Sequence, residues 1–422
     1  MSFQRKLLVV AMASVLPMAA AHAQSAADLQ KEIAALKAQL QALQQKVEAL
    51  GAAPAGPSVS QQITRIEQKQ ELAETALEES GFKGLKVSGV MEASYLTDDL
   101  GKANTFAAGD GNGGTAMLEI TKTTEDGEGV NWTLRLTPGA ASLVHEATVS
   151  YGLGDGHRIV GGLIPDYQGY EGAFSHQNLL LTHNALFDLA GPATYAGLGM
   201  SHEIGDVTAK WMLGNIDGVG ETDAAGIYKP TTGLAYRLDW TVSEYTYIGL
   251  SGAHASSTRS FDVIALDAGY SRGDWQLNGH LNFGQLKAGA FNGGDASWSG
   301  VSGLVGYKLT PRLQLLARAD YLENGKNGGG TYVANYLNNP GGDVMTDSGL
   351  GPELDSDGAV IDANKGASLT RFSLGTNYLL NASTLWKTEL RLDQSSGHNF
   401  VNDAGSFGKT KTTLGTSMVV KF

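Results

Sequence analysis

Charged side chains recur at alternate positions in many short segments, a spacing that gathers them on one face. Alternate residues of an extended strand point to the same side, so the segment 312–320 separates Arg312, Arg318 and Asp320 from Leu313 and Leu315. Cations aligned on one water-facing wall would give it a slightly basic potential. The basic residues assigned to such faces are Lys86, Arg135, Arg158, Lys210, Arg237, Lys308, Arg312, Arg318, Arg371, Lys387 and Arg391.

Acidic residues stand out in one long connection, residues 165–191, which also carries a helix-like apolar segment around residues 179–189. We hypothesise that Asp166, Glu171 and Asp188 face arginines of the wall and set up a transverse field that sorts solutes by charge. The arginines concerned are Arg135, Arg158, Arg318 and Arg371. Two alternatives stay open. The first is that residues 165–191 form an external lid on the barrel rim or on a neighbouring subunit. The second is that the wall charges only pair across strands and keep the interior hydrated.

Other chemistry is weakly indicated. The chain has no Cys, which excludes disulfides and thiolate metal sites. His176 and His183 have no evident carboxylate partner for zinc, and Ala359 stands where a calcium loop would place a third ligand. There is no GxSxG motif. We therefore predict no catalytic residue, no metal, no cofactor and no enzymatic activity.

The elements that must position the charges are strands. Sixteen segments alternate in polarity: 84–96, 114–124, 129–137, 140–153, 157–164, 192–204, 206–214, 230–240, 245–254, 260–271, 273–285, 299–309, 312–321, 369–380, 383–394 and 410–422. Short connections alternate with long ones, with two short exceptions near Pro138 and Ser256. This pattern predicts an all-β fold, a transmembrane antiparallel β-barrel of about 16 strands.

One strand of this set gives the clearest two-faced pattern. Trp275, Leu277 and Phe283 alternate with the polar residues His280 and Asn282. A charge facing lipid at the midplane would cost about 2 to 4 kcal/mol, so the polar face must line a wet interior and the apolar face must contact lipid. The last strand ends on Phe422, which resembles the signal read by the barrel-assembly machinery.

The N-terminal residues predict export. Residues 1–23 read as a signal peptide, with Arg5 and Lys6, an apolar run and an Ala21-His22-Ala23 cleavage site. Its removal leaves 30 − 2 = 28 basic residues against 43 acidic ones, a net charge of −15. Nucleic acid is therefore an unsuitable partner. No run of about 18 apolar residues follows the signal peptide, so the sequence predicts no transmembrane helix.

A helical spacer is predicted between the signal and the barrel. Residues 24–50 carry a heptad seam, with Ile33, Leu40 and Val47 at a and leucines at d. Residues 51–58 (GAAPAGPS) form a linker, and a second helix follows over residues 59–80. Such a coiled coil oligomerises, and we favour a homotrimer over a dimer. An even strand number places both barrel ends, and hence the coiled coil, in the periplasm.

Several segments resemble a known family. They are GFKGLKVSG at 81–89, PDYQGYE at 165–171, LTHNALFDL at 181–189, KNGGG at 326–330 and the terminal strand. They are similar to a family of porin-like outer-membrane proteins of Gram-negative bacteria that is catalogued as a domain of unknown function. The resemblance covers most of residues 81–422 and implies a porin-like barrel, without site residues.

We therefore expect an outer-membrane porin of a Gram-negative bacterium, embedded in outer-membrane lipid, that passes small hydrophilic solutes by diffusion, with a weak anion preference as a secondary expectation. Its periplasmic coiled coil would extend toward the cell wall. The alternative is a structural or adhesive protein, in which a barrel anchors an oligomeric stalk and the long loop of residues 322–368 binds a partner.

Overall fold

The computed structural model describes residues 84–107, 116–124, 129–138, 143–192, 194–222, 227–257, 260–330 and 348–422, together with Gln68, Lys69 and Leu72. The chain divides into two units, Met1–Lys83 and Gly84–Phe422. The three described residues of the first unit are helical. The predicted signal peptide, coiled coil and linker, and most of the predicted second helix, lie outside the described residues.

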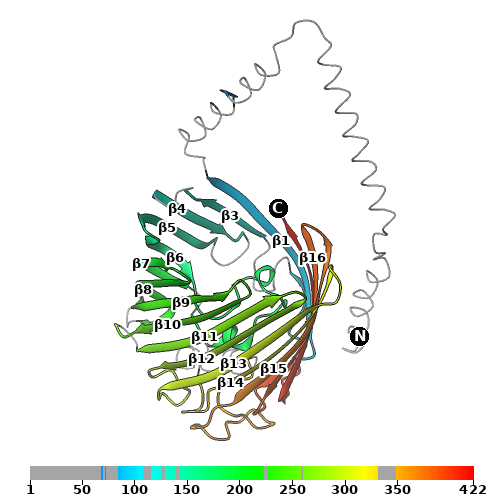
Figure 1. The fold of residues 1–422 in the computed structure, drawn as a ribbon. Coiled ribbons are helices and arrows are strands. Elements are labelled where there is room, and N and C mark those ends of the chain that lie inside the picture. The colour runs from blue at the N-terminus through cyan, green and yellow to red at the C-terminus, as the bar shows by residue number, and fades with distance from the viewer. Residues whose placement is uncertain are drawn as a thin grey trace, which may run out of the picture. The chain divides into compact units, whose positions relative to one another are not determined.

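The second unit is a closed antiparallel barrel (Figure 1). Its strands are β1 (Leu85–Asp98), β2 (Asn104–Ala107), β3 (Ala116–Lys122), β4 (Gly129–Leu136), β5 (Val144–Gly154), β6 (His157–Pro165), β7 (Thr194–Ile204), β8 (Val207–Thr222), β9 (Tyr228–Ser243), β10 (Thr246–Ala255), β11 (Phe261–Arg272), β12 (Trp275–Leu286), β13 (Ala296–Lys308), β14 (Leu313–Glu323), β15 (Ser368–Asn381), β16 (Thr384–Ser395) and β19 (Thr410–Lys421). A separate small hairpin joins β17 (Phe400–Val401) to β18 (Phe407–Gly408).

Sixteen strands make up the wall. The sheet has 17 strands, of which the four-residue β2 pairs with β1 alone, leaving 17 − 1 = 16. Pairing of β1 with β19 closes the barrel, with Glu92 opposite Val419. The predicted sixteen-stranded barrel is confirmed. The main difference is that β8 and β9 are longer than expected, so most of the predicted loop 215–229 is strand.

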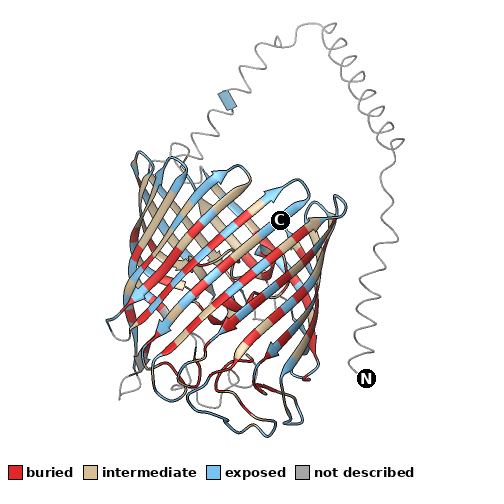
Figure 2. Cartoon of the chain, turned by 60° about the horizontal axis from the view of Figure 1, so that its bottom comes forward, coloured by how far each residue is buried: buried red, intermediate tan, exposed pale blue. Residues whose placement is uncertain are grey.

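Alternation along the strands separates two environments. In β12, Trp275 and Phe283 are 51% and 49% exposed, whereas His280 and Asn282 are 4% and 1% exposed. Exposed and buried residues alternate along most wall strands (Figure 2). The apolar face points outward, where it would meet lipid, and the polar face lines the interior. Among the described residues, no helix has the length and apolar character needed to cross a membrane.

Tight turns join the strands at the end of the barrel where β1 begins and β19 finishes. Asp155 and Gly156 turn between β5 and β6 with positive φ of 51° and 76°, and Gly205 and Gly273 have φ of 59° and 61°. Glycine adopts this left-handed conformation without the steric cost that other residues meet. The longer connections, including the described residues 324–330 and 348–367, lie at the opposite end (Figure 2).

Candidate functional site

The connection between β6 and β7 lies inside the barrel (Figure 1). We call residues 166–192 the inner loop. It contains a 3-10 turn, η2 (Ser175–Gln177), and one short helix, α4 (Ala185–Leu189). Asn184 caps α4 by accepting hydrogen bonds from the backbone N–H groups of Leu186 and Phe187. The expected helix around residues 179–189 is thus limited to its last five residues.

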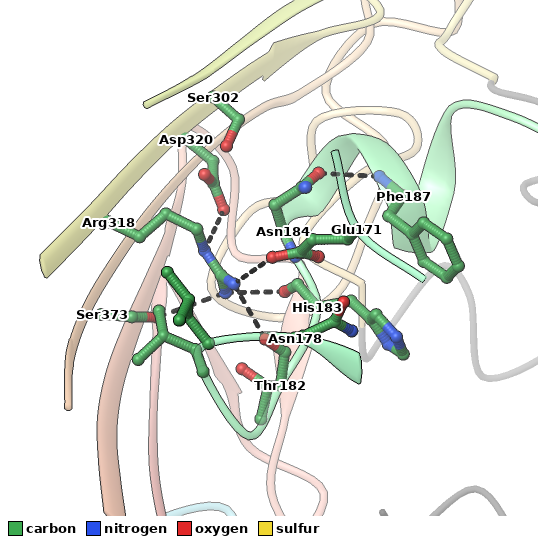
Figure 3. Close-up of polar contacts among 12 residues, drawn as sticks. Glu171, Asn178, Thr182, His183, Asn184, Phe187, Ser302, Arg318, Asp320 and Ser373 are labelled. Carbon is green, nitrogen blue, oxygen red and sulfur yellow. Dashed lines mark hydrogen bonds and ion pairs between the residues drawn. The ribbon is translucent and has the colours of Figure 1, made fainter. Parts of the chain in front are cut away.

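Arg318 of β14 anchors the middle of the inner loop (Figure 3). Its Nη1 lies 2.9 Å from Oε1 of Glu171 and donates to the carbonyl of Thr182 at 2.8 Å, while Nη2 donates to the carbonyl of His183 at 2.7 Å. Its Nε lies 3.3 Å from a carboxylate oxygen of Asp320. The Arg318 side chain is 0% exposed. A buried charge without such partners would be strongly destabilising, so this cluster fixes the loop to the wall.

Arg371 of β15 makes a second anchor. Its Nη1 lies 2.6 Å from Asp188 and donates to the carbonyl of His183 at 2.9 Å, and its Nε lies 2.8 Å from Asp393 of β16. Burial acts to raise the pKa of Asp188, but Arg371, His183 and Arg391 outweigh it and hold the pKa below its ordinary value. Asp188 is therefore an anion at neutral pH.

Lys387 of β16 holds the loop through its backbone. Its ammonium donates to the carbonyls of Ser175, Asn178 and Leu180 at 2.5, 2.9 and 2.7 Å, which uses all three of its N–H groups. The side chain is 1% exposed. Because its three acceptors are backbone carbonyls, Lys387 fixes the path of the loop backbone and does not depend on the identity of the loop side chains.

Carboxylates of the wall complete the attachment. Glu389 of β16 accepts from the backbone N–H and the hydroxyl of Thr182, both at 2.7 Å. Glu92 of β1 accepts from the hydroxyls of Ser175 in the loop and Ser417 in β19. Loop and wall therefore form one hydrogen-bonded unit from β14 around the barrel closure to β1.

Two wall glycines provide room for apolar side chains of the loop. A Cβ built on Gly375 of β15 would lie 2.4 Å from a methyl of Leu180, and one built on Gly415 of β19 would lie 2.5 Å from a methyl of Leu181. Both leucines are at most 2% exposed. Any larger residue at these inward positions would push the loop away from the wall.

Asp166 does not meet an arginine. Its carboxylate accepts hydrogen bonds from the hydroxyl of Tyr195 and from the Gln168 amide, the latter at 3.3 Å. Burial raises the pKa of Asp166 to about 6, against the opposing effect of these hydrogen bonds. The expectation that Asp166 faces the wall arginines is therefore wrong, because its side chain turns toward β7 at the start of the loop.

The structure also separates Arg135 and Arg158 from the loop acids with which the sequence grouped them. Arg135 of β4 forms ion pairs with Glu119 and Glu146 at 2.5 Å each. Arg158 of β6 donates to the Ser150 hydroxyl at 3.2 Å. These pairings connect neighbouring strands rather than wall and loop.

The remaining basic residues fall in four places. Arg237 of β9 binds Asp267 of β11 and Asp239, and Arg391 of β16 binds Asp393. Lys86 and Lys308 are exposed near the turn end of the barrel, at inward positions of β1 and β13. Arg312 is exposed and lies in the turn before β14, so it is not a residue of the wall itself. Lys210 of β8 has an inward register opposite Arg237.

A cavity of 370 Å³ faces the sector of the wall from β3 to β8. Hydroxyl, amide and cationic side chains predominate among the residues that line it, including Asn131, Thr133, Ser150, Arg158, Ser201 and Lys210. Apart from the bond between Asp166 and Tyr195 of β7, the loop contacts described above lie on β14, β15, β16, β19 and β1, on another part of the wall. This cavity leaves open polar space between the start of the inner loop and the β3–β8 sector. No group of three His, Asp or Glu residues suited to a metal occurs in the described part of the chain.

The sequence pattern did not reveal the wall partners Glu92, Glu389, Gly375 and Gly415. The inward positions of these four residues follow from strand alternation, which can be read from the sequence. Their contacts with the loop depend on where the loop lies after the barrel closes, and no spacing along the chain encodes that. The same limit applies to Lys387, which was expected only to line the pore.

The comparison with family models identifies the barrel. Residues 85–422 match the family described as "Putative beta-barrel porin-2, OmpL-like". The chain belongs to this family. A search of curated protein sequences finds no match. The resemblance to a porin-like outer-membrane family is confirmed, and the barrel is that of an outer-membrane porin family.

Solved structures support the same fold at low sequence identity. An anion-selective porin from Comamonas acidovorans is 14% identical, with a TM-score of 0.54 over 80% of this chain and 99% of that one. Salmonella typhi OmpF in complex with daunomycin is 11% identical, with a TM-score of 0.52 over 80% and 97%. OmpT of Vibrio cholerae in its trimer form is 11% identical, with a TM-score of 0.50 over 80% and 99%. At these identities the likeness concerns the fold alone.

Proposed function

We propose that this porin-family barrel passes small hydrophilic solutes by passive diffusion through the space between the inner loop and the β3–β8 sector, with a weak preference for anions. The observation that carries the proposal is the 370 Å³ polar cavity beside Arg158 and Lys210. A wet lumen lined by hydroxyls can replace part of a solute's hydration, and cations on one side favour anions. The proposal includes no catalytic residue, metal or cofactor.

The charges of the inner loop take a different role in this proposal from the transverse field expected from the sequence. Glu171 and Arg318 are 2% and 0% exposed and lie in direct contact. Charges engaged in a buried pair cannot interact strongly with a passing solute, because each mainly compensates its partner. The loop charges therefore hold the narrowing element in place, and Arg158 and Lys210 supply the selectivity.

The test is ion selectivity of the purified mature protein in a planar bilayer under a KCl gradient. Arg158→Gln combined with Lys210→Gln should lower the chloride-to-potassium permeability ratio about twofold to fivefold, since the two charges together contribute on the order of 0.5 to 1 kcal/mol in water. The matched control is Lys365→Gln with Lys409→Gln, two exposed lysines at the loop end of the barrel. An unchanged reversal potential in the first variant would refute the selectivity assignment.

We also propose that the protein is a homotrimer whose coiled coil, residues 24–50, lies in the periplasm. An even number of strands brings the start of β1 and the end of β19 to the same end of the barrel. A protein of similar fold, OmpT of Vibrio cholerae, has a trimer form. Native mass spectrometry of the folded protein should give three chains per particle. A folded trimer that conducts no ions would favour the structural or adhesive alternative.

A further inference from the structure

A second polar cavity, of 780 Å³, lies on the outside of the barrel. We call it the rim pocket. It is lined by Ser299 of β13, Tyr321 and Glu323 of β14, Lys326 and Lys365 of the following loop, and Ser368 of β15. In β14 the outward Tyr321 is 40% exposed, whereas its inward neighbour Leu322 is 0% exposed. Register pairs Ser299 with Glu323, so both also face outward, toward the membrane and not the lumen.

The rim pocket lies at the loop end of the barrel. Strands β13 and β14 are joined by the tight turn after Lys308. Ser299 and Glu323 occur at the other ends of these strands, beside residues 324–330 and 348–367. Since short turns face the periplasm in bacterial outer-membrane barrels, the rim pocket is level with the headgroups of the outer leaflet.

Two lysines, Lys326 and Lys365, and two glutamates, Glu323 and Glu353, line the rim pocket. Lys326 and Lys365 are opposite each other in an isolated antiparallel β-bridge, and both are exposed. Like charges directly opposite one another are destabilising unless something compensates them. Glu353 compensates Lys365 at 2.8 Å and also accepts from the Ser396 hydroxyl at 2.9 Å. Within the described part of the chain Lys326 forms no ion pair, so it is the cation available to an anionic group, with Lys365 beside it.

The other lining groups fit a sugar that carries acyl chains. Hydroxyl groups of Ser299 and Ser368 and the carboxylate of Glu323 can exchange hydrogen bonds with sugar hydroxyls. The aromatic ring of Tyr321 and the outward Val301, which is 44% exposed, continue from the rim pocket toward the middle of the membrane. An aromatic side chain at this level is suited to the boundary between headgroups and hydrocarbon.

We propose that the rim pocket binds the phosphorylated sugar headgroup of an outer-leaflet glycolipid, with a phosphate between Lys326 and Lys365 and the acyl chains along Tyr321 and Val301. Phosphate, sugar and acyl chains occur together in this lipid class, whereas a free phosphate would use the lysines alone. The site is separate from the lumen and does not depend on which solute passes through it.

The test is binding of lipid A that carries both phosphates to the full-length folded protein, measured by native mass spectrometry from detergent. Lys326→Gln with Lys365→Gln should weaken binding about fivefold per lysine. The control is Lys229→Gln, an exposed lysine at the start of β9, on the same end of the barrel. Dephosphorylated lipid A should bind the parent protein as weakly as the double variant binds the phosphorylated form.

Two results would overturn the proposal. Equal affinity of parent and double variant for phosphorylated lipid A, with both barrels folded, would show that the lysines do not contact the lipid. Complete displacement of the lipid by inorganic phosphate at the same concentration would reassign the rim pocket to a free anion. All the substituted lysines are exposed, so the variants are expected to fold.

Discussion

Replacement of Lys387 by Met should release part of the inner loop without unfolding the barrel. Methionine keeps much of the length of the lysine side chain but donates no hydrogen bond, so the carbonyls of Ser175, Asn178 and Leu180 each lose a donor. The barrel itself is held by the backbone pairs of β16 with β15 and β19, which the substitution leaves intact.

The magnitude follows from the burial and the number of bonds. A hydrogen bond to a charged group contributes about 1.5 to 3 kcal/mol, and Lys387 makes three of them while 1% exposed. Desolvation of the ammonium offsets part of this sum. Leaving three buried carbonyls without a donor costs about 1 to 3 kcal/mol each, so after this offset we expect a net loss of about 3 to 5 kcal/mol. The ratio of undocked to docked loop should therefore rise by a factor of about 100 to 1000 or more, since about 1.4 kcal/mol corresponds to tenfold.

The assay uses the absence of cysteine from the chain. Ser175 is 0% exposed, so a Ser175→Cys thiol should react with a water-soluble maleimide only while the loop is undocked. Adding Lys387→Met should speed labelling by about 100-fold or more and should increase the noise of the open channel. The control is Lys308→Met, which makes the same change at an exposed inward position of β13. Equal labelling rates with and without Lys387 would refute the role assigned to this lysine.

Two further predictions concern the same loop. Gly375→Val should lower single-channel conductance, because its methyls would occupy the space of Leu180 and push the loop from β15 toward the open β3–β8 sector. Gly303→Val, at a position where a Cβ meets nothing within 4 Å, should leave conductance unchanged. Equal conductance of the two variants would argue against the spacing role of Gly375. The pKa of Asp188 is depressed in the docked loop, so its contribution to docking is present above about pH 4 and is lost as the pH falls below that value toward the depressed pKa. Asp188→Asn should raise thiol labelling at neutral pH and remove this part of the acid effect, and an unaltered acid response in that variant would contradict the assignment.

The strands were predictable because alternation is a local property. Every one of the sixteen expected segments overlaps a wall strand, and the polar face of β12 is the inward face. A strand in a barrel meets water on one side and lipid on the other, and this difference selects side chains with a period of two. The extensions of β8 and β9 were missed because residues 215–229 are rich in glycine and acids, which resembles a loop although the backbone continues to pair.

The loop contacts were only partly predictable. The sequence suggested that acids of residues 165–191 face wall arginines, and the structure brings Glu171 to Arg318 and Asp188 to Arg371. Asp166 instead binds Tyr195. Residue charge does not predict which of several arginines on one face pairs with a given loop acid. The pairing depends on which wall residues come within about 3 Å of a loop that crosses the lumen.

The local sequence pattern is sufficient for the class of fold, the number of strands and the inward or outward direction of most strand residues, because these depend on neighbours two positions apart. Three features appear only in the folded barrel: Lys387 and Arg318 bind loop carbonyls, Gly375 and Gly415 make room for leucines, and a polar cavity lies beside β3 to β8. These contacts join residues about 130 to 240 positions apart, which meet only when the barrel has closed around the loop.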